Sequence, residues 1–208
     1  MKKKILYLDP GHAFSLENDL KEYYKENFDV IDYYDFTDLN LENYKCIAIP
    51  PFIDQEYMYT QKEKINSFLN KGNILVFSGN LFKPWIPGTK NYIPKEITQH
   101  KDYEIHFCKN HPIFEGVTLH EMSYRKGIAG FFARGFYPTP DDSENILRLG
   151  ENEIVTYIDR KNSKGTILIH SGNDLFSYTE AGNTTGKIGM QTFNWVCNEY
   201  NSLQKQEK

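Results

Sequence analysis

Three polar side chains, Ser78, His170 and Asp174, are of the types that carry out nucleophilic catalysis. A serine hydroxyl becomes a nucleophile when a histidine accepts its proton, and an acid commonly orients that histidine. In this assignment Ser78 attacks, His170 is the base, Asp174 orients the imidazole, and the backbone amides around Gly79 hold the oxyanion. Each residue also has a structural alternative, because serine and aspartate often cap helices and turns, and a histidine can serve as a hydrogen-bonded core residue. A serine-dependent hydrolase is therefore one hypothesis.

Four further residues are candidates for binding a ligand without covalent chemistry: His12, Asn80, Trp85 and Arg134. His12 follows the first apolar run of the chain, and Asn80 lies in the same turn as Ser78. Trp85 lies in a loop between two prolines, where an aromatic ring can wall a pocket or contact a partner subunit. Arg134 is flanked by aromatic residues and could grip an anionic group with two nitrogens, although a stacked structural arginine is the common alternative.

Most of these residues follow short apolar runs that are typical of buried strands. In the first half the runs alternate with segments of helical spacing, which predicts a parallel, doubly wound sheet. The predicted strands are 5–8, 30–34, 47–49 and 74–77, and the predicted helices are 15–24 and 61–70. Thr60 is the expected N-cap of the second helix and Gly72 its left-handed end. Ligands of open α/β sheets bind at the carboxyl ends of the strands, where Ser78 and His170 are expected.

The second half predicts an elaboration of the same sheet. Residues 83–143 are rich in proline, glycine and aromatic residues, with extended pieces at 103–107 and 130–133. Three runs separated by good turn sequences then predict antiparallel neighbours, at 146–149, 154–158 and 166–169. A closing helix is expected over 188–197, and the tail from 204 is expected to fray. Residues 1–208 are therefore interpreted as one domain.

Composition excludes several classes of function. The net charge is −4, and Lys and Arg concentrate only at residues 2–4, which argues against nucleic-acid binding. No apolar run has the length of a membrane span, and residues 5–8 are too few for a signal peptide. The three cysteines are few and widely separated, which predicts neither a disulfide framework nor a metal cluster and favours a cytoplasmic protein. No phosphate loop or dinucleotide fingerprint is present, so no cofactor is expected.

The segment Asp9-Pro10-Gly11-His12 resembles the end of the first strand in zinc amidases that cleave peptidoglycan stem peptides. Zinc in such a site needs further histidine or glutamate ligands. No histidine occurs near the end of the third predicted strand, where Pro50-Pro51 stands instead. We therefore expect no metal, although His12 remains a candidate for the strand-end crevice.

Four segments in order resemble the class I glutamine amidotransferase-like superfamily, especially its trehalose-utilisation (ThuA-like) branch. They are the helix end at Lys71-Gly72, the turn at Ser78-Gly79, the segment 111–117, and the strand 165–170 before a helix containing 193–196. The resemblance covers most of the chain. It implies an α/β, flavodoxin-like three-layer sandwich with a mostly parallel central sheet and antiparallel additions in the second half.

The chain departs from that superfamily at two positions that carry its chemistry. Working glutaminases have a cysteine in the turn where this chain has Ser78, and their late histidine is followed two residues on by a glutamate, whereas Gly172 follows His170 here. The resemblance therefore implies a non-canonical domain without glutaminase activity, which binds a small polar ligand or a protein partner at the carboxyl ends of the strands. The hydrolase is the alternative. A homo-oligomer that assembles through the aromatic residues of 83–143 is a third hypothesis.

Overall fold

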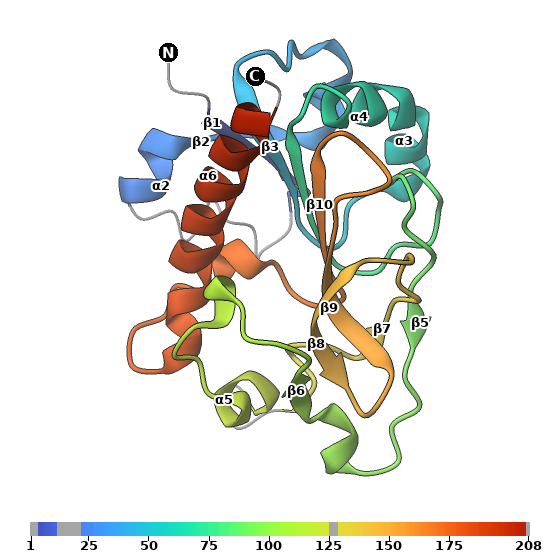
Figure 1. Ribbon diagram of the computed structural model, residues 1–208, viewed down its shortest axis with the longest axis vertical. Coiled ribbons are helices and arrows are strands. Elements are labelled where there is room, and N and C mark those ends of the chain that lie inside the picture. The colour runs from blue at the N-terminus through green and yellow to red at the C-terminus, as the bar shows by residue number, and fades with distance from the viewer. Residues whose placement is uncertain (1–3, 12–21, 125–128, 207–208) are drawn as a thin grey trace.

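The computed structural model describes residues 4–11, 22–124 and 129–206. A sheet of eight strands, in the order β2-β1-β3-β4-β10-β9-β8-β6, forms its centre (Figure 1). The strands from β2 to β10 are parallel to their neighbours, and β9, β8 and β6 add antiparallel pairs. The predicted α/β class, with a mostly parallel sheet and antiparallel additions in the second half, is confirmed. The strands of this sheet are β1 (Lys4–Asp9), β2 (Phe28–Asp32), β3 (Tyr44–Ile49), β4 (Ile74–Ser78), β6 (Ile105–Phe107), β8 (Glu144–Leu149), β9 (Glu153–Asp159) and β10 (Thr166–His170).

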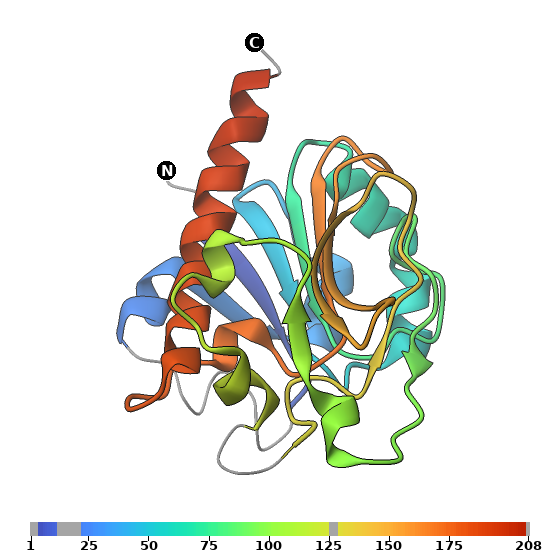
Figure 2. The same ribbon diagram turned by 60° about the horizontal axis from the view of Figure 1, so that its bottom comes forward.

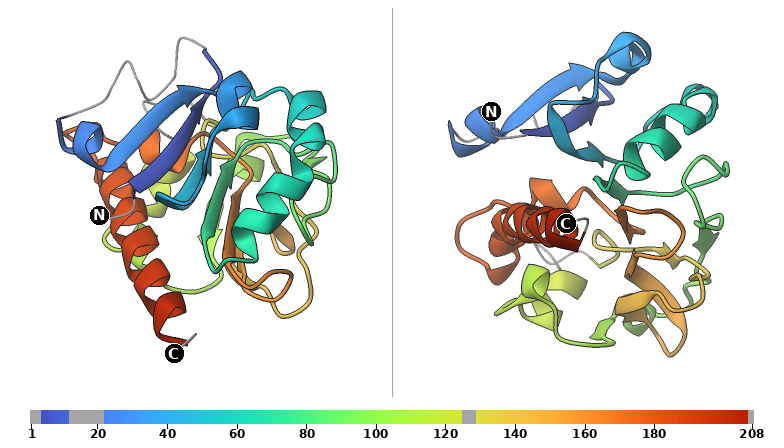
Figure 3. Two further views of the ribbon diagram at one scale, coloured as in Figure 1. Left: turned by 90° about the horizontal axis from the view of Figure 1, so that it is seen from above. Right: turned by 45° about the horizontal axis from the view of Figure 1, so that its top comes forward.

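Helices cover both faces of this sheet, which makes the structure a three-layer sandwich (Figures 2 and 3). One apolar core lies between the sheet and α6, and the other lies between the sheet and the layer of α3 and α4. The helices are α2 (Glu22–Asn27), α3 (Gln55–Thr60), α4 (Lys62–Leu69), α5 (Leu119–Ser123) and α6 (Ile188–Gln206). The 3-10 helices named below are η1 (Tyr33–Asp38) and η5 (Leu175–Ser177). A small second sheet pairs β5 (Ile93–Pro94) with β7 (Gly135–Phe136).

Two local expectations were wrong for identifiable reasons. The second strand ends at Asp32 because the Asp32 carboxylate accepts a hydrogen bond from the Tyr34 amide and starts η1. Thr60 is not an N-cap: it ends α3, which begins after Asp54, whose carboxylate accepts from two backbone amides. Gly72 has a φ of 72°, so its predicted left-handed conformation is confirmed.

The remaining expectations differ mainly in their bounds. Residues 130–133 form no strand, and the extended pair there is β7. The closing helix α6 continues to Gln206, beyond the point where fraying was expected. Most of the helix expected at 15–24 lies outside the described residues.

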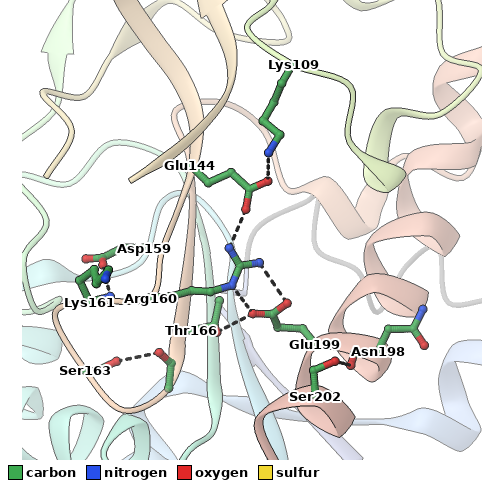
Figure 4. A network of polar contacts seen from close by, with 11 residues as sticks. Lys109, Glu144, Asp159, Arg160, Lys161, Ser163, Thr166, Asn198, Glu199 and Ser202 are labelled. Atoms are coloured by element: carbon green, nitrogen blue, oxygen red, sulfur yellow. Dashed lines mark hydrogen bonds and ion pairs between the residues drawn. The ribbon is translucent and has the colours of Figure 1, made fainter. Parts of the chain in front are cut away.

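A network of charged side chains joins α6 to the antiparallel strands (Figure 4). Arg160, just after β9, donates two hydrogen bonds to Glu199 of α6, at 2.5 and 3.0 Å, and one to Glu144 of β8, at 2.6 Å. Lys109 forms a second ion pair with Glu144, at 2.6 Å, and the Thr166 hydroxyl donates to Glu199 at 2.8 Å. Because Thr166 begins β10, this network lies at the opposite end of β10 from His170.

Candidate functional site

A hollow of about 800 Å³ opens at the carboxyl ends of β3, β4 and β10. This is where ligands of open α/β sheets bind, and the volume suits a small molecule. Four loops supply its walls, and we call this site the hollow below. It is lined by residues 51–56 after β3, Gly79, Asn80, Phe82, Lys83 and Tyr92 after β4, Gly130, Phe131 and Arg134 before β7, and residues 171–173 after β10.

The turn after β4 is built around a glycine. Gly79 has a φ of 125°, and a Cβ atom there would lie 2.9 Å from the Cα of Pro51. The buried Tyr137 hydroxyl donates to the Gly79 carbonyl at 2.6 Å and accepts from the Leu81 amide at 2.8 Å. These contacts hold the turn against β3 and leave Asn80 exposed at the hollow.

Ser78 and His170 are neighbours across β4 and β10, and both side chains are fully buried. Paired residues of parallel strands point to the same face of the sheet, so the structure brings these two side chains together, outside the lining of the hollow. The Ser78 hydroxyl accepts from the Leu175 amide at 3.4 Å. The imidazole Nδ1 of His170 lies 2.8 Å from the Thr156 hydroxyl, and its Nε2 has no hydrogen-bond partner in the described part of the chain.

Asp174 belongs to the same buried cluster, but its contacts differ from those predicted. Its carboxylate caps η5 by accepting from the Phe176 amide at 3.1 Å, and it accepts from the Tyr7 hydroxyl, also at 3.1 Å. Burial raises the pKa of Asp174 to about 6, although these two hydrogen bonds favour the carboxylate. Burial also lowers the pKa of His170 to about 3, although the nearby Phe132 carbonyl favours protonation. The histidine is therefore neutral at ordinary pH.

The arrangement lacks the contacts of a serine triad. Neither a Ser78–His170 nor a His170–Asp174 hydrogen bond is present among the described residues, since Thr156 and Tyr7 are the partners instead. A nucleophilic serine in an α/β hydrolase occupies a strained turn that leads into a helix. Here Ser78 is the last residue of β4, the positive φ falls on Gly79, and an irregular loop follows. As folded, the cluster presents no nucleophile to solvent.

The four predicted ligand-binding residues have three different positions. Asn80 and Arg134 both line the hollow. Trp85 is only 1% exposed and packs edge-on against Phe77 in the core, with 5.4 Å between the ring centroids, so it lies outside the lining. His12 lies outside the described residues.

Arg134 is held in place by two contacts. Its Nε donates to the Gly130 carbonyl at 3.2 Å, and its guanidinium carbon lies 5.6 Å from the centre of the Tyr103 ring. Gly130 has a φ of 82°, and a Cβ atom there would lie 2.5 Å from the Tyr103 ring, so the packing requires glycine. These contacts fix the side chain through its Nε atom and one face, and among the described residues the two terminal nitrogens have no hydrogen-bond partner and can meet a ligand.

Sequence reasoning missed three phenylalanines that line the hollow and are strongly exposed. Phe52, Phe82 and Phe131 are 76%, 58% and 48% exposed. Phe52 also has a φ of 69°, a conformation that bulky side chains rarely adopt and that concentrates at functional sites. The break after β3 at Pro50-Pro51 marked this loop, but the exposure of a phenylalanine has no signal in the sequence.

Two kinds of feature are absent from the described residues. No group of three or more His, Cys, Asp or Glu side chains there could hold a metal ion. In the same ranges, no helix has the length and apolarity needed to cross a membrane.

Comparisons with known proteins place the fold. No family model and no curated protein matches the sequence. A cytoplasmic protein from Salmonella typhimurium is structurally similar, with a TM-score of 0.58 and 12% identity over 91% of this chain and 98% of that chain. PurLQS from Thermotoga maritima is similar with a TM-score of 0.50 and 15% identity over 95% of this chain and 99% of that chain. At these identities the likeness concerns the fold alone.

Proposed function

We propose that this chain is an amidotransferase-like domain of the ThuA-like branch, without glutaminase activity, that binds a small polar ligand in the hollow. One observation carries the proposal: the hollow is open and lined by Asn80 and Arg134, whereas Ser78 and His170 are closed from solvent and bonded to other groups. The fold likeness to PurLQS supports the amidotransferase-like part. The serine at the position of the superfamily's cysteine supports the absence of glutaminase activity.

Ligand binding is tested by amide NMR spectra of the ¹⁵N-labelled protein with a library of small polar compounds. A ligand of the hollow should shift the amides of Gly79, Asn80 and Gly172, which line it, while Gly182, which lies outside the lining, serves as the reference. Shifts confined to other parts of the protein would place the binding site elsewhere.

The glutaminase part is tested by ammonia release from glutamine. We expect no release above the protein-free rate, because the chain lacks a thiol at the turn and its imidazole is bonded to Thr156. Ammonia release by the wild type that Ser78→Ala abolishes would contradict the proposal.

A serine-dependent hydrolase is the second candidate, and the register that pairs Ser78 with His170 is the observation that favours it. It requires the Ser78 hydroxyl to leave the Leu175 amide and turn toward Nε2 of His170. A fluorophosphonate probe decides between the two functions. We expect no labelling, and labelling that Ser78→Ala abolishes would establish the hydrolase.

A protein partner, including a second copy of the chain, is the alternative occupant of the hollow, because exposed phenylalanines also mark interfaces. Light scattering after size exclusion at high concentration tests self-association. A dimer that Phe52→Ser dissociates would favour assembly over a small ligand.

The proposed location is the cytoplasm, which three free cysteines, Cys46, Cys108 and Cys197, support.

A further inference from the structure

The hollow has both apolar and charged surface, and a ligand that is polar throughout would match only part of it. It combines three exposed phenylalanine rings with a positioned guanidinium. Exposed rings cost free energy in water unless something covers them, and a set of three around one hollow fits an apolar, preferably aromatic, surface. Arg134 lies in the same lining, and its guanidinium favours an anionic group. A ligand that satisfies both has a flat apolar body and a negatively charged end.

The charged residues of the lining limit how much negative charge the ligand can carry. Among the described lining residues the cations are Lys83 and Arg134, and Lys83 already forms an ion pair with Glu56 at 2.6 Å. Asp54 adds a negative charge, although its carboxylate accepts hydrogen bonds from Tyr34 and two backbone amides. One available guanidinium can balance a single negative charge. A doubly charged phosphate would need further cations that these residues do not provide.

The geometry of the Arg134 guanidinium favours a carboxylate, which carries a single negative charge. The terminal nitrogens of an arginine form a planar fork that matches a carboxylate with two parallel hydrogen bonds. The Nε contact with Gly130 and the Tyr103 ring hold this fork before a ligand arrives, so less side-chain entropy is lost on binding. Tyr92 also lines the hollow, and its ring packs edge-on against Phe82, with 6.1 Å between the ring centroids.

We infer that the ligand of the hollow is an aromatic carboxylate, whose carboxylate is bound by Arg134 and whose ring packs among Phe52, Phe82 and Phe131. The inference rests on the proposed ligand-binding function and narrows it to a chemical class. Asn80 and Asn173, which also line the hollow, are positioned to select among polar substituents on such a ring. No covalent step is involved.

Three probes of matched shape test the inference by calorimetry and amide NMR spectra. They are 1-naphthylacetate, the neutral 1-naphthylacetamide, and acetate, which has the charge without the ring. We expect naphthylacetate to bind at least about tenfold more tightly than the amide, because a charge-assisted bidentate contact replaces neutral hydrogen bonds. Acetate should bind more weakly than either.

Variants assign the contacts. Arg134→Gln should remove the preference for the acid over the amide, whereas Lys71→Gln, a matched control at an exposed cation outside the lining, should leave the preference unchanged. Phe131→Ser should weaken both naphthyl probes by a similar factor without changing their ratio. Arg134 and Phe131 are both exposed, so these variants are expected to fold, which circular dichroism checks.

The outcomes separate this inference from the proposed function. Equal affinity for the acid and the amide, with shifts at the amides of the hollow, would keep the binding function and overturn the carboxylate. Acetate that binds as tightly as naphthylacetate would overturn the aromatic body. If no probe at millimolar concentration shifts the amides of the hollow, the aromatic carboxylate is overturned, and the library of small polar compounds then decides the proposed function. A preference for the acid that survives in Arg134→Gln would place the anion site elsewhere.

Discussion

Thr156 supplies the buried imidazole of His170 with its hydrogen-bond partner, because β9 and β10 pair these two residues across the sheet. Both side chains are fully buried, so neither can exchange its partner for water. A buried polar atom that loses its partner bears its full desolvation cost. Nε2 of His170 already lacks a partner in the described part of the chain, so Nδ1 carries the hydrogen bonding of this ring.

Thr156→Val should therefore lower the free energy of unfolding by about 1 to 3 kcal/mol, measured by urea denaturation. Thr192→Val is the matched control. Thr192 is equally buried, but its hydroxyl donates to the Ile188 carbonyl one turn earlier in α6, which the helix itself already supplies with a donor. We expect the control to lose less than about 1 kcal/mol. Equal losses in the two variants would show that the imidazole does not depend on Thr156.

Asp174 should make stability depend on pH. Its folded pKa of about 6 lies above the usual value for aspartate, so between roughly pH 4 and 6 the folded state binds more protons than the unfolded state. The free energy of unfolding therefore falls as the pH rises through this window, and it stays lowered at higher pH. Asp174→Asn removes the titration and keeps an oxygen for the Phe176 amide, so we expect a gain of about 2 kcal/mol at pH 7.5 and little change at pH 4. Urea midpoints that differ equally at both pH values would contradict this assignment.

At the scale of elements, the sequence predicts the parallel strands better than the loops between them. Residues 47–49 and 74–77 are continuous apolar runs, and both are buried strands of the structure. Turn sequences also predicted the antiparallel order of β8, β9 and β10. Element boundaries are harder to predict, because at the end of β2 (Asp32) and at the start of α3 (Asp54) they depend on side-chain caps that compete with continued strand or loop.

The candidate site was predictable in place but less so in detail. The carboxyl ends of β4 and β10 follow from the parallel topology, and Asn80 and Arg134 do line the hollow. Whether a side chain points into the core or into the hollow depends on loops without periodicity. Trp85 and Phe131 illustrate this, since both lie in aromatic loops, yet the first is buried and the second is exposed.

The loop after β10 depends on the loop before β7. A Cβ atom on Gly172 would lie 1.7 Å from the Phe132 carbonyl oxygen and 2.6 Å from Nε2 of His170. Gly172→Ala must therefore separate the two loops, and we expect a loss of about 1 to 3 kcal/mol together with weaker binding in the hollow. In Gly182→Ala the new Cβ meets nothing within 4 Å, so that variant carries only the cost of a positive φ. Unchanged binding in Gly172→Ala would show that the loops move independently of the site.

At the scale of the whole molecule, Arg160 links the antiparallel strands to α6 at the end of the sheet remote from the hollow. The side chains of Glu144 and Glu199 are only 22% and 13% exposed. In a variant without Arg160, water would therefore solvate these two carboxylates only in part. The contact with Glu199 is bidentate, and Lys109 adds a second cation at Glu144. A half-buried network of this kind contributes more than an isolated surface pair.

Arg160→Met should lower the free energy of unfolding by about 1 to 3 kcal/mol at pH 7. The control is Lys4→Met, which breaks the Lys4–Asp29 pair. Those side chains are 42% and 38% exposed, and we expect a loss below about 1 kcal/mol. Thermal unfolding of both variants, followed by circular dichroism, makes the comparison.

The pH dependence of the same variant separates charge from packing. Burial opposes ionisation of Glu144, but the hydrogen bonds from Lys109 and Arg160 outweigh it and lower the pKa of this carboxyl. A lowered folded pKa stabilises the protein above the ordinary glutamate pKa, and the contribution is lost as the pH falls through the folded value. The deficit of Arg160→Met should therefore shrink as the pH falls below about 4, where the unfolded carboxyl becomes protonated. A deficit that is constant from pH 7 to pH 3 would mean that Arg160 stabilises the molecule through its aliphatic packing, and the ion pairs of the network would then contribute little.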